Sequence, residues 1–457
     1  MRDKRNKRER RDRSLGALNF SRVSLFPPVS RGAFAAETIA IGSELLIGGR
    51  SDSNSLFLAD ELGLLGIAVR FKSVVGDDRQ DIVTAIHTAA KRAQVIMMTG
   101  GLGPTVDDCT REAVAYATGH RLGRRKEALD GMTARLAQWG RTPSTAQLRQ
   151  AMIPSGATVL KNPVGSAPGF CLTWKRALII CLPGVPSEME AMMRQEVLPL
   201  LRAACESSGR QPGTAIVRQV FHTFGLAEAD IDAKLQGLIS KRMPVDLGLL
   251  ASPIGVLVSL TTKGIPTAKG KNHDLLEKLA NGVRSRLNEW LFAEGRDTME
   301  EVVGRELTTR GLTLAVAESC TGGLIGHRLT QVAGSSAYVD RGAVCYSNQA
   351  KTEMLGVPEA LIAQYGAVSR EVAAAMACGM RERAHVSVGL SVTGIAGPGG
   401  GTETKPVGLV YIGLDDGTGR PITREFRFHG DRNVIKHRSS QAALDLLRRW
   451  LLGKVLV

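Results

Sequence analysis

The sequence predicts an α/β protein with a doubly wound N-terminal domain, a small α+β middle domain and an α/β C-terminal domain. In the first and last thirds of the 457 residues, short apolar runs alternate with longer amphipathic runs. This alternation is typical of parallel sheets that are covered by helices. A stretch rich in Ser, Gly and Pro (205–214) ends the first of these regions, and such stretches mark domain boundaries.

Charge sets the beginning of the chain apart. The protein has 59 Lys and Arg against 44 Asp and Glu, a formal net charge of +15. Residues 1–36 hold ten of the basic residues and only three acids, so they are expected to form a disordered basic tail. Nucleic-acid contact is the functional interpretation of this tail. We favour the alternative of a solvated tail, so no nucleic-acid partner is expected.

The first folded domain is expected over residues 37–205. Its Gly turns and the Asp at the start of its second helix give each element a defined end. The expected elements are a strand at 36–45, a helix at 53–67, a strand at 69–77, a helix at 77–93, a strand at 94–105 that runs into a Gly-rich loop, and a buried strand within 177–189.

Two further domains follow, over residues 206–295 and 296–457. The middle one is expected to contain strands within 217–225 and 246–264, a helix at 228–240 and a long helix at 273–292. The last one is expected to contain helices at 297–311, 322–332, 370–384 and 435–452, and strands at 312–319, 342–347, 386–394 and 406–414.

Cysteine usage and hydropathy predict the compartment. The seven cysteines are scattered, odd in number and without a CxxC pair, so neither a disulfide framework nor a Cys-based zinc site is expected. No apolar run approaches the roughly 20 residues that a membrane-spanning helix needs. We therefore expect a cytoplasmic protein with no membrane partner.

The first candidate site is the loop TGGLGPTVDDCT (99–110), which follows an apolar strand. Glycine amides and a helix start at the carboxyl end of a parallel strand favour anion binding, and Asp107 and Asp108 are candidates for holding a metal or a hydroxyl-rich ligand. Carboxylates at the ends of two neighbouring strands, in GSE (42–44) and GDD (76–78), point to the same pocket. The alternative is a tight turn with Asp as a helix cap.

The second candidate site is AESCTGGLIG (317–326), which places Ser319 at a strand-to-helix turn. A hydroxyl in such a turn is exposed beside backbone amides, as a nucleophile with an oxyanion site requires. Cys320 is a competing nucleophile, although small buried cysteines are common. Lys351 is a candidate base if burial lowers its pKa, and a solvated helix lysine is the alternative. His327 resembles a residue on a helix face.

A third segment, SVTGIAGPGGGTETKPVG (391–408), follows Thr393 and Gly394 at the end of a strand. Its amides could cradle a phosphate. Arg432, at a helix start, is suited to the same anion. The alternative is turn chemistry combined with surface charge.

The N-terminal motifs IGSELLIGGRSDSNSLFLADELGLLGI, VVGDD, TGGLGPTVDDCTREA, LKNPVGSAPGF and LPGVPSEME resemble the molybdopterin-binding fold of the MoaB/MogA type and, more closely, the CinA family. Some members of that family hydrolyse ADP-ribose with a divalent metal. The resemblance implies Co²⁺, Mn²⁺ or Mg²⁺ as the metal. The residues that it implies are Gly100, Gly101, Gly103, Thr105 and Asn54 for substrate, and Asp77, Asp108 and Glu44 for metal.

The middle domain resembles the KH-like domain that CinA proteins carry, on the basis of TFGLAEADIDAKL and LGLLASPIGVLVSL. KH domains that bind RNA clamp its backbone with a GXXG loop. Residues 206–295 contain no GXXG. We therefore expect a spacer or dimerisation module.

The motifs AVAESCTGGLIGHRLTQVAGSS, GAVCYSNQAKTEMLGV, SVTGIAGPGGGTETKPVG and FHGDRNVIKHR resemble the CinA C-terminal domain. This family includes amidohydrolases that convert nicotinamide mononucleotide (NMN) to nicotinate mononucleotide and ammonia without a metal or other cofactor. The resemblance implies Ser319 as nucleophile and Lys351 as base, with Thr393 and Tyr346 assisting or positioning. It implies that the remaining site residues bind substrate or hold the oxyanion: Thr321, Gly322, Gly323, Gly394, Gly397 and Arg432.

The leading interpretation is therefore a homodimeric enzyme that deamidates NMN and also cleaves ADP-ribose in its first domain. The alternative is a catalytically inactive sensor that binds a nucleotide or molybdopterin. A DNA-associated competence factor that acts through the basic tail is a third interpretation.

Overall fold

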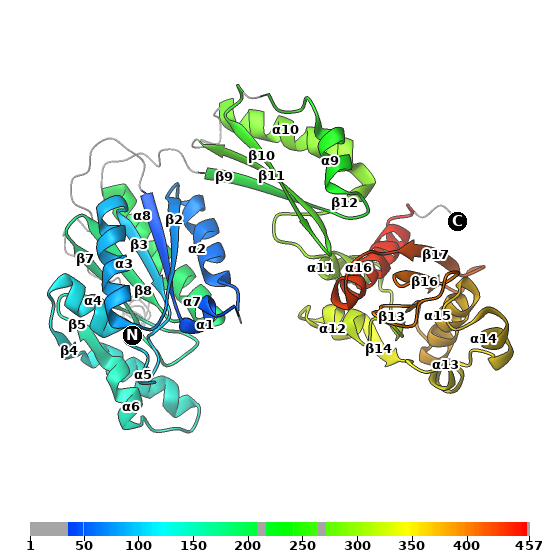
Figure 1. Cartoon of the computed structure of the whole chain (residues 1–457), viewed down its shortest axis with the longest axis horizontal. Coiled ribbons are helices and arrows are strands. Elements are labelled where there is room, and N and C mark those ends of the chain that lie inside the picture. The colour runs from blue at the N-terminus through cyan, green and yellow to red at the C-terminus, as the bar shows by residue number, and fades with distance from the viewer. Residues whose placement is uncertain (1–34, 49, 208–215, 241, 264–270, 455–457) are drawn as a thin grey trace, which may run out of the picture. The chain divides into compact units, whose positions relative to one another are not determined.

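The computed structural model describes residues 35–48, 50–207, 216–240, 242–263 and 271–454. The predicted basic tail lies almost entirely outside these residues. The described chain divides into two compact units, with the division between Val217 and Arg218. Figure 1 labels the elements of both units. None of the described helices combines the length and apolar character that crossing a membrane requires.

A six-stranded sheet with the order β2-β1-β3-β8-β7-β6 forms the centre of the first unit. Its first four strands are parallel, and the last two run antiparallel at one edge. The prediction of a doubly wound domain is confirmed. Strands β7 and β6 extend the parallel sheet at the β8 edge by antiparallel pairing. The strands are β1 (Ala35–Ile41), β2 (Ala68–Val75), β3 (Val95–Thr99), β6 (Thr158–Leu160), β7 (Gly169–Trp174) and β8 (Ala177–Leu182).

Helices cover both faces of this sheet, as Figure 1 shows. Successive residues of β3 point to opposite faces, so Val95 and Met97 pack in one core cluster while Ile96 and Met98 pack in another. The helices on the Val95 face are α2 (Ser53–Leu64), α7 (Pro186–Met192) and α8 (Leu198–Ser207), and those on the Ile96 face are α3 (Arg79–Arg92) and α4 (Thr110–Thr118).

The rest of the first unit consists of short elements around the sheet. The strands β4 and β5 form a separate antiparallel pair. These elements are α1 (Ser43–Leu46), β4 (Leu122–Arg124), α5 (Lys126–Gln138), α6 (Thr145–Leu148), the 3₁₀ turn Arg149–Ala151, β5 (Met152–Pro154) and the π-helical turn Met193–Val197.

The second unit begins with a four-stranded sheet of order β10-β11-β9-β12. The predicted helix at 273–292 is too long, because it ends at Leu287, where Asn288 takes a left-handed φ of 32°. The chain then forms β12, which pairs antiparallel with β9. The elements are β9 (Ile216–Thr223), α9 (Glu228–Leu235), β10 (Val245–Ser252), β11 (Gly255–Lys263), α10 (Lys271–Leu287), the 3₁₀ turn Asn288–Trp290 and β12 (Leu291–Glu294).

The C-terminal domain has a five-stranded sheet of order β14-β13-β15-β16-β17. The first three strands are parallel, and β16 and β17 continue the sheet in antiparallel pairing. The α/β prediction is confirmed, although the strand expected at 342–347 begins earlier. The strands are β13 (Leu314–Glu318), β14 (Val339–Val344), β15 (Val388–Gly394), β16 (Leu409–Asp415) and β17 (Ile422–Arg427).

Helices again cover both faces. Leu314 and Val316 of β13 pack in one core cluster, and Ala315 and Ala317 pack in the other. The first face carries α11 (Met299–Arg310), α12 (Leu324–Thr330), the 3₁₀ turn Ser335–Ala337 and α16 (Arg432–Leu451), and the second carries α13 (Asn348–Leu355), α14 (Glu359–Tyr365) and α15 (Arg370–Ala384).

The parallel pairing brings three loops to one edge of this sheet. Glu318, the last residue of β13, pairs with Val344 of β14 on one side and with Val392 of β15 on the other. The residues that follow each strand, Ser319 among them, therefore meet at the carboxyl end of the sheet, where α/β proteins bind ligands.

Candidate active site

The side chains of Ser319 and Lys351 are in contact at this edge. Ser319 follows β13 directly, and Lys351 lies in the first turns of α13. Lys351 Nζ is 3.2 Å from Ser319 Oγ, and both side chains are buried. The structure thus joins two groups that are 32 residues apart in the chain.

Backbone carbonyls hold Lys351 in place. Its Nζ donates to the carbonyl oxygen of Cys345 at 3.0 Å and lies 3.4 Å from that of Tyr346. Among the described residues no carboxylate forms an ion pair with Lys351. Burial, which penalises the ammonium form, lowers the pKa of Lys351 below its ordinary value. A neutral amine here can accept the Ser319 proton across the same short contact.

Glu318 builds the turn that carries Ser319. Its side chain is buried, and its carboxylate accepts the amide protons of Gly323, Ile325 and Gly326 at 2.8–3.1 Å. These amides start α12, so Glu318 satisfies donors that a helix N-terminus otherwise leaves unpaired. The sequence analysis gives Glu318 no role, although it directly precedes Ser319, the candidate nucleophile.

The amides of Gly322 and Gly323, which are expected to hold the oxyanion, already have hydrogen-bond partners within the protein. The Gly322 amide donates to the carbonyl of Ser319 at 3.1 Å, and the Gly323 amide donates to Glu318. The amides of Gly322 and Gly323 are therefore engaged within the turn, and their role toward an oxyanion stays a prediction. Thr321 lies between the nucleophile and these glycines, and neither bond engages its amide. Its buried hydroxyl also lacks a hydrogen-bond partner.

The other predicted residues of this domain form the rim and wall of the site. The guanidinium of Arg432 donates to the carbonyl of Gly397 at 2.6 Å and to the hydroxyl of Tyr346 at 2.7 Å. Tyr346 is 59% exposed. The buried Thr393 hydroxyl donates to the carbonyl of Ala367 at 2.8 Å, so it holds a neighbouring loop in place.

Gly394 is needed for packing, because a Cβ there would lie 2.8 Å from the carbonyl oxygen of Leu409. Strand β16, which contains Leu409, pairs with the end of β15 at this point. The close approach of the two strands therefore accounts for the glycine without a ligand.

Two competing candidates differ sharply from Ser319. Burial raises the pKa of the Cys320 thiol to about 12, so it stays protonated at neutral pH. His327 is exposed on α12, where its ring lies 3.0 Å from the side-chain nitrogen of Gln331. Neither residue therefore competes with Ser319 as nucleophile or with Lys351 as base.

Lys436 lies beside the nucleophile turn and was not singled out from the sequence. A Cβ placed on Gly322 would be 3.6 Å from Lys436 Nζ. Lys436 follows Arg432 by four residues in α16, so both lie on one side of the helix. The spacing of four residues from Arg432 is the feature of the sequence that could have indicated Lys436 as a site residue.

The glycine loop of the first unit is bonded mainly to itself. Asp108 accepts the amide protons of Gly103 at 2.9 Å and Thr105 at 2.8 Å, and also the Thr105 hydroxyl. The buried Arg111 donates to the carbonyls of Leu102 and Gly103. Gly100 and Gly101 have positive φ angles, and a Cβ at Gly100 would lie 2.1 Å from a carbonyl oxygen. These glycines are therefore required by packing.

The predicted metal ligands do not gather. Asp77 accepts the Ser43 amide at 2.8 Å, Asp108 caps its own loop, and Glu44 is exposed on α1. In the described parts of the chain, no group of three or more His, Cys, Asp or Glu side chains is placed to hold a metal ion. Asp77, Asp108 and Glu44 are therefore not arranged to hold a divalent metal in the described chain, and their assignment as metal ligands stays a prediction.

Asn54 lies where the resemblance implies a pocket. Its side-chain amide donates to the carbonyl of Gly184 at 2.9 Å, and its buried Oδ1 has no hydrogen-bond partner. Gly184 in turn lies close to Gly100. The structure thus brings Asn54 near the loop, with one acceptor left free.

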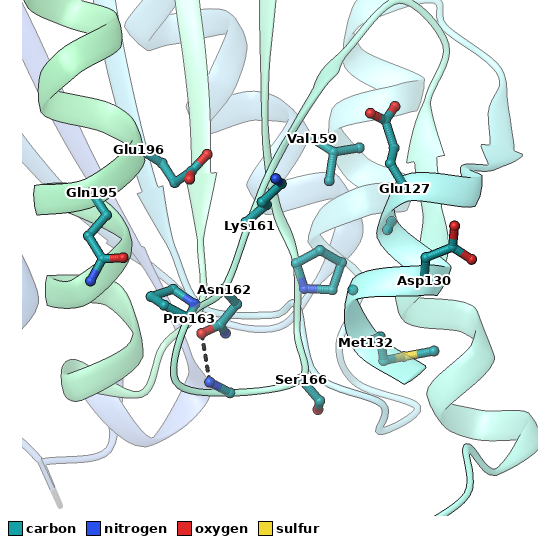
Figure 2. A pocket seen from close by; sticks show the side chains of 14 residues that line it. Glu127, Asp130, Met132, Val159, Lys161, Asn162, Pro163, Ser166, Gln195 and Glu196 are labelled. Atoms are coloured by element: carbon teal, nitrogen blue, oxygen red, sulfur yellow. Dashed lines mark hydrogen bonds between the residues drawn. The ribbon is translucent and has the colours of Figure 1, made fainter. Parts of the chain in front are cut away.

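A cavity of about 560 Å³ in the first unit lies along the segment 159–168. Figure 2 shows Lys161 between acidic side chains from two walls, with Glu127 and Asp130 on one and Glu196 on the other. None of the predicted glycine-loop residues lines this cavity. The cavity therefore does not support the predicted anion site.

Comparisons with known proteins agree with the domain order. Three family descriptions match the chain: "Probable molybdopterin binding domain" over residues 37–203, "Damage-inducible protein CinA KH domain" over residues 218–293 and "CinA C-terminal domain" over residues 296–451.

Similar proteins extend over most of the chain. A CinA-like protein from Geotalea uraniireducens is 40% identical over 416 residues, covering 91% of this chain and 97% of the relative. Another from Citrifermentans bemidjiense is 43% identical over 418 residues, with 91% and 97% covered. A solved structure of the competence/damage inducible protein CihA from Agrobacterium tumefaciens is 44% identical and covers 33% of this chain and 94% of its own, with a TM-score of 0.32. The chain therefore belongs to the CinA family.

Proposed function

We propose that the C-terminal domain hydrolyses the carboxamide of NMN, which gives nicotinate mononucleotide and ammonia. The observation that carries this proposal is the buried Lys351 Nζ at 3.2 Å from Ser319 Oγ, without a carboxylate partner in the described chain. A lysine in this environment is an effective base for a serine hydroxyl. The resemblance to the CinA C-terminal domain suggests the substrate.

The chemistry is acyl transfer through the serine. Neutral Lys351 accepts the Ser319 proton while Oγ attacks the carboxamide carbon and forms a tetrahedral intermediate. The Lys351 ammonium then protonates the leaving nitrogen, so ammonia departs and an ester remains on Ser319. Water, deprotonated by the same lysine, hydrolyses the ester and restores Ser319.

Thr321 is the residue best suited to stabilise the oxyanion. Its amide lies in the turn after Ser319 and takes no part in the bonds of Gly322 and Gly323. One preorganised donor in a site that excludes water contributes roughly 3–4 kcal/mol to the stability of an oxyanion. Glu318 keeps the turn in place, so the donor is fixed before substrate binds.

Ammonia release from NMN by the full chain tests the proposal. We expect Ser319→Ala to lower the rate about a thousand-fold or more, while the neighbouring Cys320→Ala keeps most of the activity. Cys320 is the matched control because it lies in the same turn and is also buried. If Cys320→Ala alone abolished turnover, the serine–lysine assignment would be wrong.

Cleavage of ADP-ribose by the N-terminal domain stays a prediction. In the described chain, Asp77, Asp108 and Glu44 are not arranged to hold the divalent metal that the resemblance implies. An ADP-ribose assay supplemented in turn with Co²⁺, Mn²⁺ and Mg²⁺ tests this activity, and silence with all three would remove it.

A further inference from the structure

Arg432 is engaged with protein acceptors, although the sequence predicts that it binds the substrate phosphate. Its two terminal nitrogens donate to the carbonyl of Gly397 and the hydroxyl of Tyr346. These bonds tie together three segments at the rim of the site: the loop after β15, the residues after β14 and the start of α16. These bonds use two of the five N–H donors of Arg432 and fix the direction of its guanidinium.

Lys436 is a second cation beside the turn that carries Ser319. It is half-buried beside Gly322, and across the described residues its ammonium has neither a hydrogen bond nor an ion pair. An ammonium has three donors. Its charge reaches the nucleophile turn, since it lowers the pKa of the Cys320 thiol against the larger effect of burial.

The position of this charge is unfavourable for the helix itself. Arg432 and Lys436 lie in the first turns of α16, where the helix dipole favours acids; the N-cap Asp431 supplies one, and the first turn itself contains none. The two cations are also i,i+4 neighbours, which repel each other. The helix dipole and the neighbouring Arg432 therefore disfavour a cation at this position, and an anion bound beside Lys436 would offset both effects.

We propose that Lys436 binds the phosphate of the nucleotide substrate, while Arg432 holds the rim of the site. This inference rests on the proposed function and names the part of the substrate that Lys436 recognises. A phosphate monoester carries a charge of about −1.5 to −2 at neutral pH and three acceptor oxygens. It complements an unpaired ammonium at the positive end of a helix.

Deamidation of NMN and of nicotinamide riboside by the full chain tests the inference, because the riboside has the same carboxamide without the phosphate. For Lys436→Met we expect KM for NMN to rise about ten-fold or more, with kcat nearly unchanged. The kcat/KM for the riboside should change less than about two-fold. Lys436→Arg keeps the charge and should retain the preference for NMN.

Lys454→Met is the matched control. It removes one exposed lysine just beyond the C-terminal end of the same helix, so it changes the net charge equally and should leave both substrates unaffected. An equal loss on NMN and riboside, or a loss confined to kcat, would overturn the inference, because either result places Lys436 at the reacting carboxamide.

Binding separates this inference from the proposed function. In the Ser319→Ala background, we expect calorimetry to detect NMN and inorganic phosphate, and Lys436→Met to weaken both. If the wild-type chain released no ammonia but this weakening were found, the proposed function alone would fail. If the wild type were active and the Lys436→Met change did not weaken binding, the inference alone would fail.

Discussion

Two glycine-rich loops follow buried parallel strands in this protein, and their side chains are used in opposite ways. The loop after β3 and the turn after β13 each contain two consecutive glycines with positive φ angles. Each is also capped by a carboxylate, Asp108 in the first unit and Glu318 in the second. In the first loop the polar side chains mostly bind the loop itself. In the second, a buried amine faces a hydroxyl.

This difference supports the proposal that the turn after β13 is reactive and that the loop after β3 is structural. Glycines at the end of a strand allow the backbone to turn sharply in both places. Each contacts a buried cation that forms no ion pair among the described residues, Arg111 in the first loop and Lys351 in the second, but only Lys351 lies against a side-chain hydroxyl. Keeping Lys351 there costs free energy, because burial disfavours its ammonium form. A group retained at such a cost is a candidate for catalysis.

The largest expected effect follows from removing this amine. Lys351→Met keeps an unbranched side chain, one atom shorter, and takes away the base, so NMN deamidation should fall about a thousand-fold or more. The melting temperature should change little, because removing a buried amine offsets the hydrogen bond that the carbonyl of Cys345 loses. Ammonia release and thermal unfolding measure both quantities. If Lys351→Met kept substantial activity, the contrast between the two loops would lose its chemical basis.

The pH dependence of the rate should show the same group. Burial lowers the pKa of Lys351, and the reaction needs the neutral amine. The rate should therefore rise with pH, by about ten-fold per unit well below this pKa, and level off above it. The midpoint should lie below the ordinary lysine value of about 10.4. Cys320→Ala should have the same profile, and a flat profile between about pH 6 and pH 10 would contradict the assignment.

Stability should depend on pH with a matching sign. Between the folded pKa of Lys351 and the unfolded value near 10.4, the unfolded chain holds a proton that the folded chain lacks. The free energy of unfolding should therefore gain a contribution that rises with pH across this window. Lys351→Met should lack this contribution, so denaturant unfolding of both proteins at several pH values isolates it.

The sequence alone predicts much of the fold and less of the site. Strand β3 and helix α3 could be predicted because their apolar spacing is local. Strand β12 was missed, because its partner β9 lies about 70 residues earlier in the chain. The amide of Gly323 was assigned to an oxyanion because nothing in the order of residues reveals that the Glu318 side chain folds back onto it. Likewise, of the two carboxylates after β2, Asp78 is the N-cap of α3 and Asp77 accepts the Ser43 amide.

A smaller effect is expected from the cap of the reactive turn. Glu318→Gln keeps the shape of the side chain, but its amide nitrogen cannot accept one of the three backbone protons. The buried turn should lose about 1–3 kcal/mol of stability, and the rate should fall about ten-fold or more because Ser319 is no longer held against Lys351. The rate of NMN deamidation and the melting temperature check this. An unchanged rate despite a lower melting temperature would show that the turn tolerates movement.

The smallest effect should come from the matching cap in the first unit. Asp108→Asn makes the same chemical change at a carboxylate that also accepts backbone protons, those of Gly103 and Thr105. The first unit should lose roughly 1 kcal/mol of stability, less than the second unit loses in Glu318→Gln because Asp108 is only half-buried. NMN deamidation should not change, because Asp108 belongs to the loop without the buried amine. Calorimetric unfolding of the full chain measures the loss of stability, and ammonia release measures the rate of NMN deamidation. If Asp108→Asn lowered deamidation as Glu318→Gln does, the two loops would be functionally coupled, and treating the first as a scaffold alone would be wrong.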